Sequence, residues 1–141
     1  MAEALFRKAV EDRGDYSVSS AGVSATNGTS ANPETVEVLK KRAVSLGKFR
    51  SRQISKEIIE NATHVFAMTR SHLETLEARF PEFSDKFHLV CDYAEIPKRG
   101  IAIDVPDPIG MGRAAYQDTA NILEIAIPTI IAFIDQTYKK A

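Results

Sequence analysis

Apolar residues recur every three or four positions at the start of the chain, along one side of residues 2–13. This spacing predicts an amphipathic helix, which should end at Arg13 and Gly14. Asn32 followed by Pro33 is typical of a helix start and predicts a second helix over 33–46. Ser55 is a suitable cap for a short third helix that reaches residue 60.

Extended stretches lie between these helices. Residues 16–22 and 87–90 predict short strands, and 63–68 is apolar enough for a strand buried on both faces of a parallel sheet. Ser71 and Glu74 match a capping box that opens a helix reaching residue 80. Residues 93–105 are predicted to be a loop. A final helix should start near Gly112, and Pro128 should either kink it or remove one of its hydrogen bonds. The alternation predicts a single three-layer α/β/α domain over residues 1–141.

Bulk properties narrow the possible functions. A formal net charge of −1 gives no electrostatic reason to expect nucleic acid or a membrane as a partner. The longest apolar stretch, 122–134, is interrupted and too short to span a bilayer. Cys91 is the one cysteine, which agrees with a reducing cytoplasm. The three histidines lack metal-ligand spacing, and we predict neither a metal nor a cofactor.

Four motifs carry a family resemblance: Ser19-Ser20-Ala21-Gly22-Val23, Ser51-Arg52-Gln53, Ala67-Met68-Thr69 and Asp107-Pro108-Ile109-Gly110. Together with the opening helix they resemble the low-molecular-weight protein tyrosine phosphatases. The resemblance implies a small doubly wound, flavodoxin-like parallel sheet. In that family a central strand and a Cys-x5-Arg-Ser-Pro phosphate loop come directly before a Met-Ala-Glu-Ala segment. We therefore expect the first central strand and the nucleophile to be missing from this chain.

The resemblance assigns roles to particular residues. Asp107 matches the general acid that protonates the leaving oxygen and later activates water. By local sequence alone it is a turn-capping residue, as is common for Asp before Pro, and Asp104 is a competing carboxylate. Ser20 matches a serine that supports the phosphate loop. Thr26 and Asn27 in one wall, with Ile109 in the other, match the substrate pocket.

Cys91 is a poor replacement for the missing nucleophile. Pro97 stands where Cys-x5-Arg requires arginine, and the intervening residues add acidic groups that would repel phosphate. We therefore predict a structural thiol.

Two hypotheses follow from these residues. The natural product is longer and hydrolyses a phosphorylated protein, at phosphotyrosine or phosphoarginine, while the present chain is inactive. Alternatively, the short chain is a pseudophosphatase or interaction module. Without a central strand it should be marginally stable, and it could self-associate through exposed strand edges.

Overall fold

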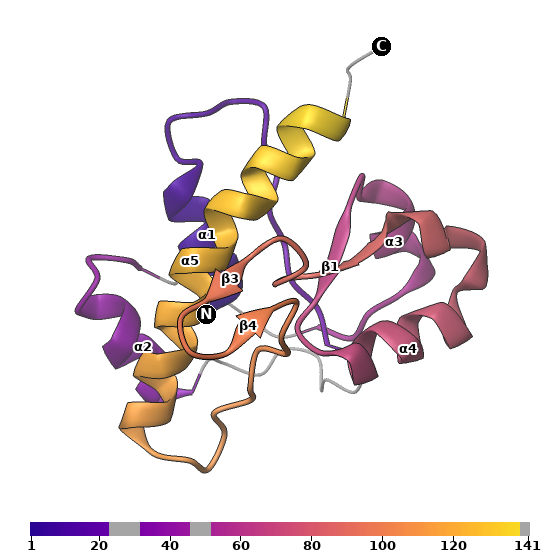
Figure 1. The fold of residues 1–141 in the computed structure, drawn as a ribbon. Helices are drawn as coiled ribbons and strands as arrows, with labels where there is room; N and C mark the ends of the chain where they lie inside the picture. Colours follow the sequence, from indigo (N-terminus) through magenta and orange to yellow (C-terminus); the bar gives the residue numbers. More distant parts are fainter. Residues whose placement is uncertain (23–31, 46–51, 139–141) are drawn as a thin grey trace.

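The computed structural model of the chain describes residues 1–22, 32–45 and 52–138. Helices and short strands alternate along these ranges (Figure 1). In chain order the elements are α1 (Ala2–Ala9), α2 (Pro33–Lys40), α3 (Lys56–Asn61), β1 (Val65–Ala67), α4 (Arg70–Arg79), the 3-10 helix η1 (Pro81–Lys86), β2 (Phe87–Leu89), β3 (Glu95–Ile96), β4 (Gly100–Ile101) and α5 (Arg113–Thr137).

Polar side chains cap the helices at their first turns. The Asn32 side chain accepts a hydrogen bond from the Glu34 amide at 2.9 Å, and the Ser55 hydroxyl accepts one from Ile58 at 3.3 Å. Both expected caps are therefore confirmed. The prediction that Ser71 caps the next helix is wrong. Helix α4 begins at Arg70, and Thr69 is its cap, because the Thr69 hydroxyl accepts a hydrogen bond from the His72 amide.

A parallel pair of strands forms the centre of the fold. In the register of β1 and β2, Val65 lies opposite Phe87 and Ala67 opposite Leu89. Of the predicted strand 16–22, one residue, Gly22, makes a bridge, which is parallel and pairs it with Gln53. Within the described ranges no ladder joins residues 16–22 to β1. The extended segment therefore lacks the neighbour that would make it a regular strand.

A small hairpin occupies part of the region predicted to be a loop. Strands β3 and β4 pair antiparallel, with Glu95 opposite Ile101 and Ile96 opposite Gly100. The backbone is left-handed at Lys98 in the turn and at Gly100, the first residue of β4, with φ of 66° and 99°. With two residues in each strand, the hairpin has too little periodicity to be recognised in the sequence.

Helices cover β1 from two sides. In Figure 1, α1 and α5 lie on one side of β1, and α3 and α4 lie on the other. The larger apolar core joins α1, α2 and α5 to the end of β2 and to β3, with Leu39, Cys91 and Leu123 at its most buried positions. A smaller core between α3, α4 and the strand pair contains Ile59, Leu76 and Phe87.

The last helix is the longest element and packs along the larger core. α5 contacts α1, α2 and β3. The helix continues through Pro128, which is exposed to solvent. By length and composition α5 is the one described helix that could cross a membrane, which is weak evidence because core helices of soluble proteins pass the same test. Leu123, Ile127 and Ile130 on its inner face are at most 4% exposed, as expected of such a core helix.

Candidate active-site loop

Asp107 lies in the exposed loop that connects β4 to α5. One carboxylate oxygen, Oδ1, accepts a hydrogen bond from the Ile109 amide at 3.1 Å. The Met111 amide donates to the Pro108 carbonyl at 2.9 Å and closes the next turn. The turn-capping role considered from the local sequence is therefore present. It occupies one oxygen, and the other accepts no hydrogen bond from the part of the chain that the structure describes.

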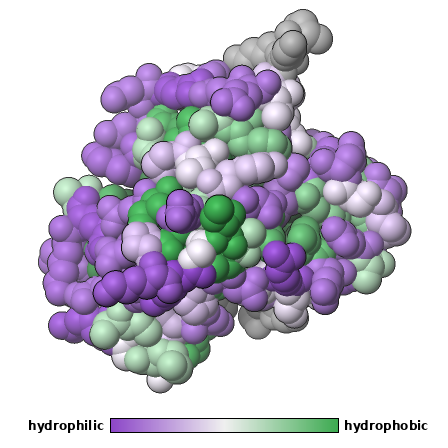
Figure 2. Space-filling model, in the orientation of Figure 1, coloured by the Kyte–Doolittle hydropathy of each residue, from purple (hydrophilic) through white to green (hydrophobic). Residues whose placement is uncertain are grey.

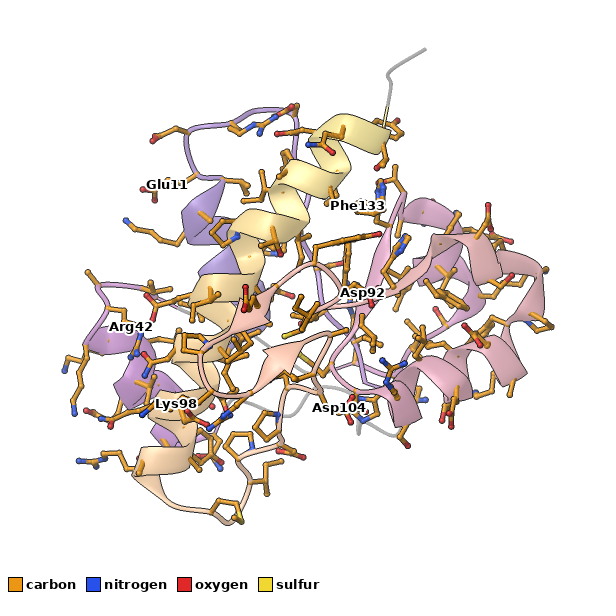
Figure 3. The ribbon with its side chains drawn as sticks, viewed as in Figure 1. Glu11, Arg42, Asp92, Lys98, Asp104 and Phe133 are labelled. Atoms are coloured by element: carbon orange, nitrogen blue, oxygen red, sulfur yellow. The ribbon has the colours of Figure 1, made fainter. Side chains whose placement is uncertain are left out.

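The base of this loop is hydrogen-bonded beside β1 and at the start of α4, and it also contacts α5. Val105 is 2% exposed, and its amide donates to the Met68 carbonyl just after β1 at 2.9 Å. The Asp104 carboxylate accepts from the Arg70 amide at the start of α4, also at 2.9 Å (Figure 3). The Thr119 hydroxyl of α5 lies 3.4 Å from the Pro106 carbonyl, while its one hydrogen has a nearer acceptor in the Ala115 carbonyl of its own helix at 3.0 Å. Asp107 therefore follows a firmly held segment.

By sequence, Asp104 is a second carboxylate that competes with Asp107 for the role of general acid. The structure gives the two carboxylates different partners, since Asp104 bonds the first amide of α4 and Asp107 bonds its own turn. The signal that could have indicated this was the position of Thr69 and Arg70. They follow strand β1 and begin α4, and the first amides of a helix need hydrogen-bond acceptors from outside the helix.

Ser20 is half-buried near the end of the extended segment 16–22. Its hydroxyl donates to a Glu3 carboxylate oxygen at 2.8 Å, and its carbonyl accepts from the Arg52 guanidinium at 3.0 Å. Glu3 also pairs with Arg7 at 3.2 Å. Arg52 thus binds a backbone carbonyl of the extended segment, and Ser20 is attached to α1 rather than to Asp107.

The predicted pocket walls are only partly described. Ile109 is 70% exposed and Met111 equally so, and Figure 2 shows the loop between β4 and α5 as a hydrophobic projection at the bottom of the view. Thr26 and Asn27 lie outside the described residues. Ile109 is therefore available to contact a ligand beside Asp107, without forming a closed pocket with described neighbours.

The thiol of Cys91 belongs to the larger core. Its side chain is fully buried, and burial, together with the negative charges of Asp92 and Asp104, raises its pKa. A nucleophilic cysteine needs the opposite, an exposed thiol with a lowered pKa. The environment therefore agrees with a structural thiol.

Two histidines that the sequence left unassigned join a cluster of aromatic rings. His64 and His88 have ring centroids 5.8 Å apart, and both lie against Phe133 of α5. Burial lowers the pKa of each histidine. Among the described residues no group of three or more His, Cys, Asp or Glu side chains is arranged to hold a metal ion.

Comparisons with known proteins agree on one family. The family model for "Low molecular weight phosphotyrosine protein phosphatase" matches residues 1–140. A protein-arginine-phosphatase of Bacillus subtilis is 34% identical over 125 residues, which cover 88% of this chain and 80% of that protein. The tyrosine phosphatase Wzb of Escherichia coli K12 is 27% identical over 110 residues, covering 78% and 71%. The solved YwlE arginine phosphatase of Geobacillus stearothermophilus superposes with a TM-score of 0.82 at 30% identity, over 99% of this chain and 89% of that one.

Proposed function

Because this chain belongs to the low molecular weight phosphotyrosine protein phosphatase family, we propose that its Asp107 loop supplies the general acid for hydrolysis of a phosphorylated protein. The loop carries the proposal: Asp107 is exposed, the Ile109 amide holds one of its oxygens, and the other oxygen accepts no hydrogen bond from a described residue. A fixed carboxyl group at a loop tip can protonate a leaving oxygen and then accept a proton from attacking water.

The reaction also needs a nucleophile and a cradle for the phosphate oxygens. A cysteine thiolate attacks phosphorus while the bond to the leaving atom breaks, and Asp107 protonates that atom, the phenolic oxygen of phosphotyrosine or a guanidinium nitrogen of phosphoarginine. Water then attacks the cysteinyl phosphate and gives its proton to Asp107, while the S–P bond breaks and releases inorganic phosphate and the thiolate. The 141 residues contain no Cys-x5-Arg sequence, and their one cysteine is in the core. We therefore propose that these residues alone do not turn over substrate.

The proposed substrate is phosphoarginine or phosphotyrosine in a protein. Among the relatives, two proteins named protein-arginine-phosphatase are 34% and 36% identical to this chain, which favours phosphoarginine. The aliphatic Ile109 beside the acid supports the same choice, since it gives a tyrosine ring no aromatic partner. The proposed setting is the cytoplasm, in keeping with a single free, buried thiol.

The direct test supplies the missing machinery. A version of the chain preceded by an apolar strand and a Cys-x5-Arg-Ser-Pro loop should hydrolyse an aryl phosphate and a phosphoarginine peptide, in a vanadate-sensitive manner. In that version Asp107→Ala should lower turnover about 10²–10⁴-fold. Asp12→Ala, at an exposed position remote in sequence from the loop, is the matched control and should leave turnover unchanged.

Three results would contradict the proposal. An extended protein that folds and binds vanadate but stays inert would remove the phosphatase assignment. Vanadate-sensitive turnover by the 141 residues alone would show that the nucleophile lies elsewhere. Turnover that survives Asp107→Ala would exclude Asp107 as the acid.

The alternative function is a non-catalytic interaction module. The 141 residues contain no Cys-x5-Arg sequence, and a protein that only binds its partners does not need one. The edge of β1 away from β2 makes no ladder with the described residues, so a strand from another molecule could add there. Analytical ultracentrifugation of the 141-residue chain discriminates the two. Concentration-dependent association abolished by a β1 edge change, Val65→Pro, supports the module, whereas a monomer at all concentrations argues against self-association.

A further inference from the structure

We propose that Asp104 is a positioning residue that holds the Asp107 loop on the first turn of α4. The inference deepens the proposed function and rests on it, because a fixed loop matters to catalysis only if Asp107 is the acid. It concerns the loop itself, however, and can be tested without turnover.

The geometry of the contact carries the inference. Asp104 accepts from the amide of Arg70, the first residue of α4, at 2.9 Å. The amides of a helix's first turn have no partners within the helix, and the helix dipole favours a negative charge there. In α4, Thr69 satisfies the His72 amide, and Asp104 satisfies a second one from another part of the chain. The bond therefore does two tasks, completing the helix cap and fixing the loop.

The neighbouring backbone shows that this part of the loop is held against its own preference. Ala102 has a φ of 56°, in the left-handed region that a residue with a Cβ rarely adopts. Such a conformation persists when the surrounding contacts impose it. Here the Ala102 amide donates to the Cys91 carbonyl at 3.1 Å, and the Val105 amide donates to Met68. Asp104 lies between these two bonds and adds a charged acceptor.

The loop consequently has two parts. Residues 102–106 are bonded to the core and to α4, whereas residues 107–111 are largely exposed and, among the residues that the structure describes, bond only inside their own turn. In Figure 3 Asp104 lies beside the beginning of α4, at the side of the molecule from which this loop extends. The direction in which Asp107 projects is therefore set one turn earlier, at Asp104.

Amide hydrogen exchange of the 141-residue chain by NMR tests this. Asp104→Ala removes the bond that Arg70 makes to a charged group, which is usually worth tenfold or more, and should accelerate exchange of the neighbouring Val105 amide by up to about that factor. The Ile109 amide, which reports the place of the Asp107 carboxylate, should accelerate as well. The Leu123 amide, in the core part of α5, should not change. Asp104→Asn keeps an acceptor oxygen and should restore slow exchange to within about threefold.

The inference is tested by comparing amide exchange in Asp104→Ala, Asp104→Asn and a control variant. Asp12→Ala, a change at an exposed carboxylate outside the loop, should leave all three amides unchanged. Unchanged exchange of Val105 and Ile109 in Asp104→Ala overturns the inference, as does an equal acceleration of Leu123, which would show a merely global loss of stability. If Asp104→Asn does not restore slow exchange, the inference that an acceptor oxygen at residue 104 holds the loop is wrong. If the exchange results hold but Asp107→Ala does not slow the extended enzyme, the proposed function fails and the anchoring stands.

Discussion

Replacing Lys86 by methionine removes a cationic cap from α3 while keeping a side chain of similar length. The Lys86 ammonium donates to three carbonyls at the end of that helix: Ile59 at 3.1 Å, Glu60 at 3.3 Å and Ala62 at 2.9 Å. All three of its donor hydrogens are therefore engaged. The ammonium also lies 5.2 Å from the centre of the Phe83 ring.

The expected loss in the free energy of unfolding is set by the hydrogen bonds that Lys86→Met removes. A hydrogen bond that involves a charged group contributes about 1.5–3 kcal/mol, and a cation at a helix C-terminus adds about 0.3–1 kcal/mol. The three bonds share one ammonium, and the Glu60 carbonyl is at an exposed contact where water can replace the donor. We therefore expect Lys86→Met to lower the free energy of unfolding by about 2 kcal/mol.

Thermal and urea unfolding, followed by circular dichroism, measure the loss. An unfolding entropy of about 2.1 cal/mol/K per residue gives roughly 0.3 kcal/mol/K for 141 residues, so Tm should fall by about 7 °C. Lys98→Met is the matched control, because Lys98 is an exposed lysine on the β3–β4 turn. A loss below about 0.5 kcal/mol, or one no larger than that of Lys98→Met, would refute the reasoning, since surface changes have effects of that size.

Two further predictions concern titratable side chains. Burial lowers the pKa of His64 and His88, so the unfolded chain binds more protons and stability should fall as pH drops through about 6.5, levelling off below the folded-state values. Urea midpoints between pH 5 and 8 measure this slope, and it should flatten in His64→Gln and His88→Gln; an unchanged slope contradicts the burial argument. Burial and a hydrogen bond to Asp135 raise the pKa of Tyr16 to about 12. In an ultraviolet titration Tyr16 should ionise later than an ordinary tyrosine, and Asp135→Asn should bring its pKa down; a Tyr16 that titrates near 10 would refute the bond.

Local signals in the sequence predicted the elements and the family well. The resemblance read from short motifs such as Asp107-Pro108 is confirmed by the family match over residues 1–140, and the flavodoxin-like α/β fold is confirmed by the solved relatives. The caps at Asn32 and Ser55 are confirmed because a cap acts on amides two or three residues away. The roles of Asp107, Ser20 and Ile109 remain proposals.

Contacts between distant residues could not be predicted in the same way. Lys86 reaches carbonyls 24 to 27 residues earlier, and Asp104 reaches an amide 34 residues earlier. Neither side chain carries a local sign of its partner. The start of α4 was misplaced for a related reason, because Thr69 and Ser71 are both good cap residues and only the end of β1 decides between them.

The burial of Cys91 turns the single sulfhydryl of this protein into a built-in reporter of global opening. A side chain with 0% exposure reacts with an alkylating reagent only when the core around it comes apart. Labelling kinetics of the native chain therefore count unfolding events without denaturant, added dye or heat. The same chemistry applies to every point variant of the 141-residue chain described above, since each keeps Cys91 as its one cysteine, and mass spectrometry of a mixture can rank their opening rates in a single tube.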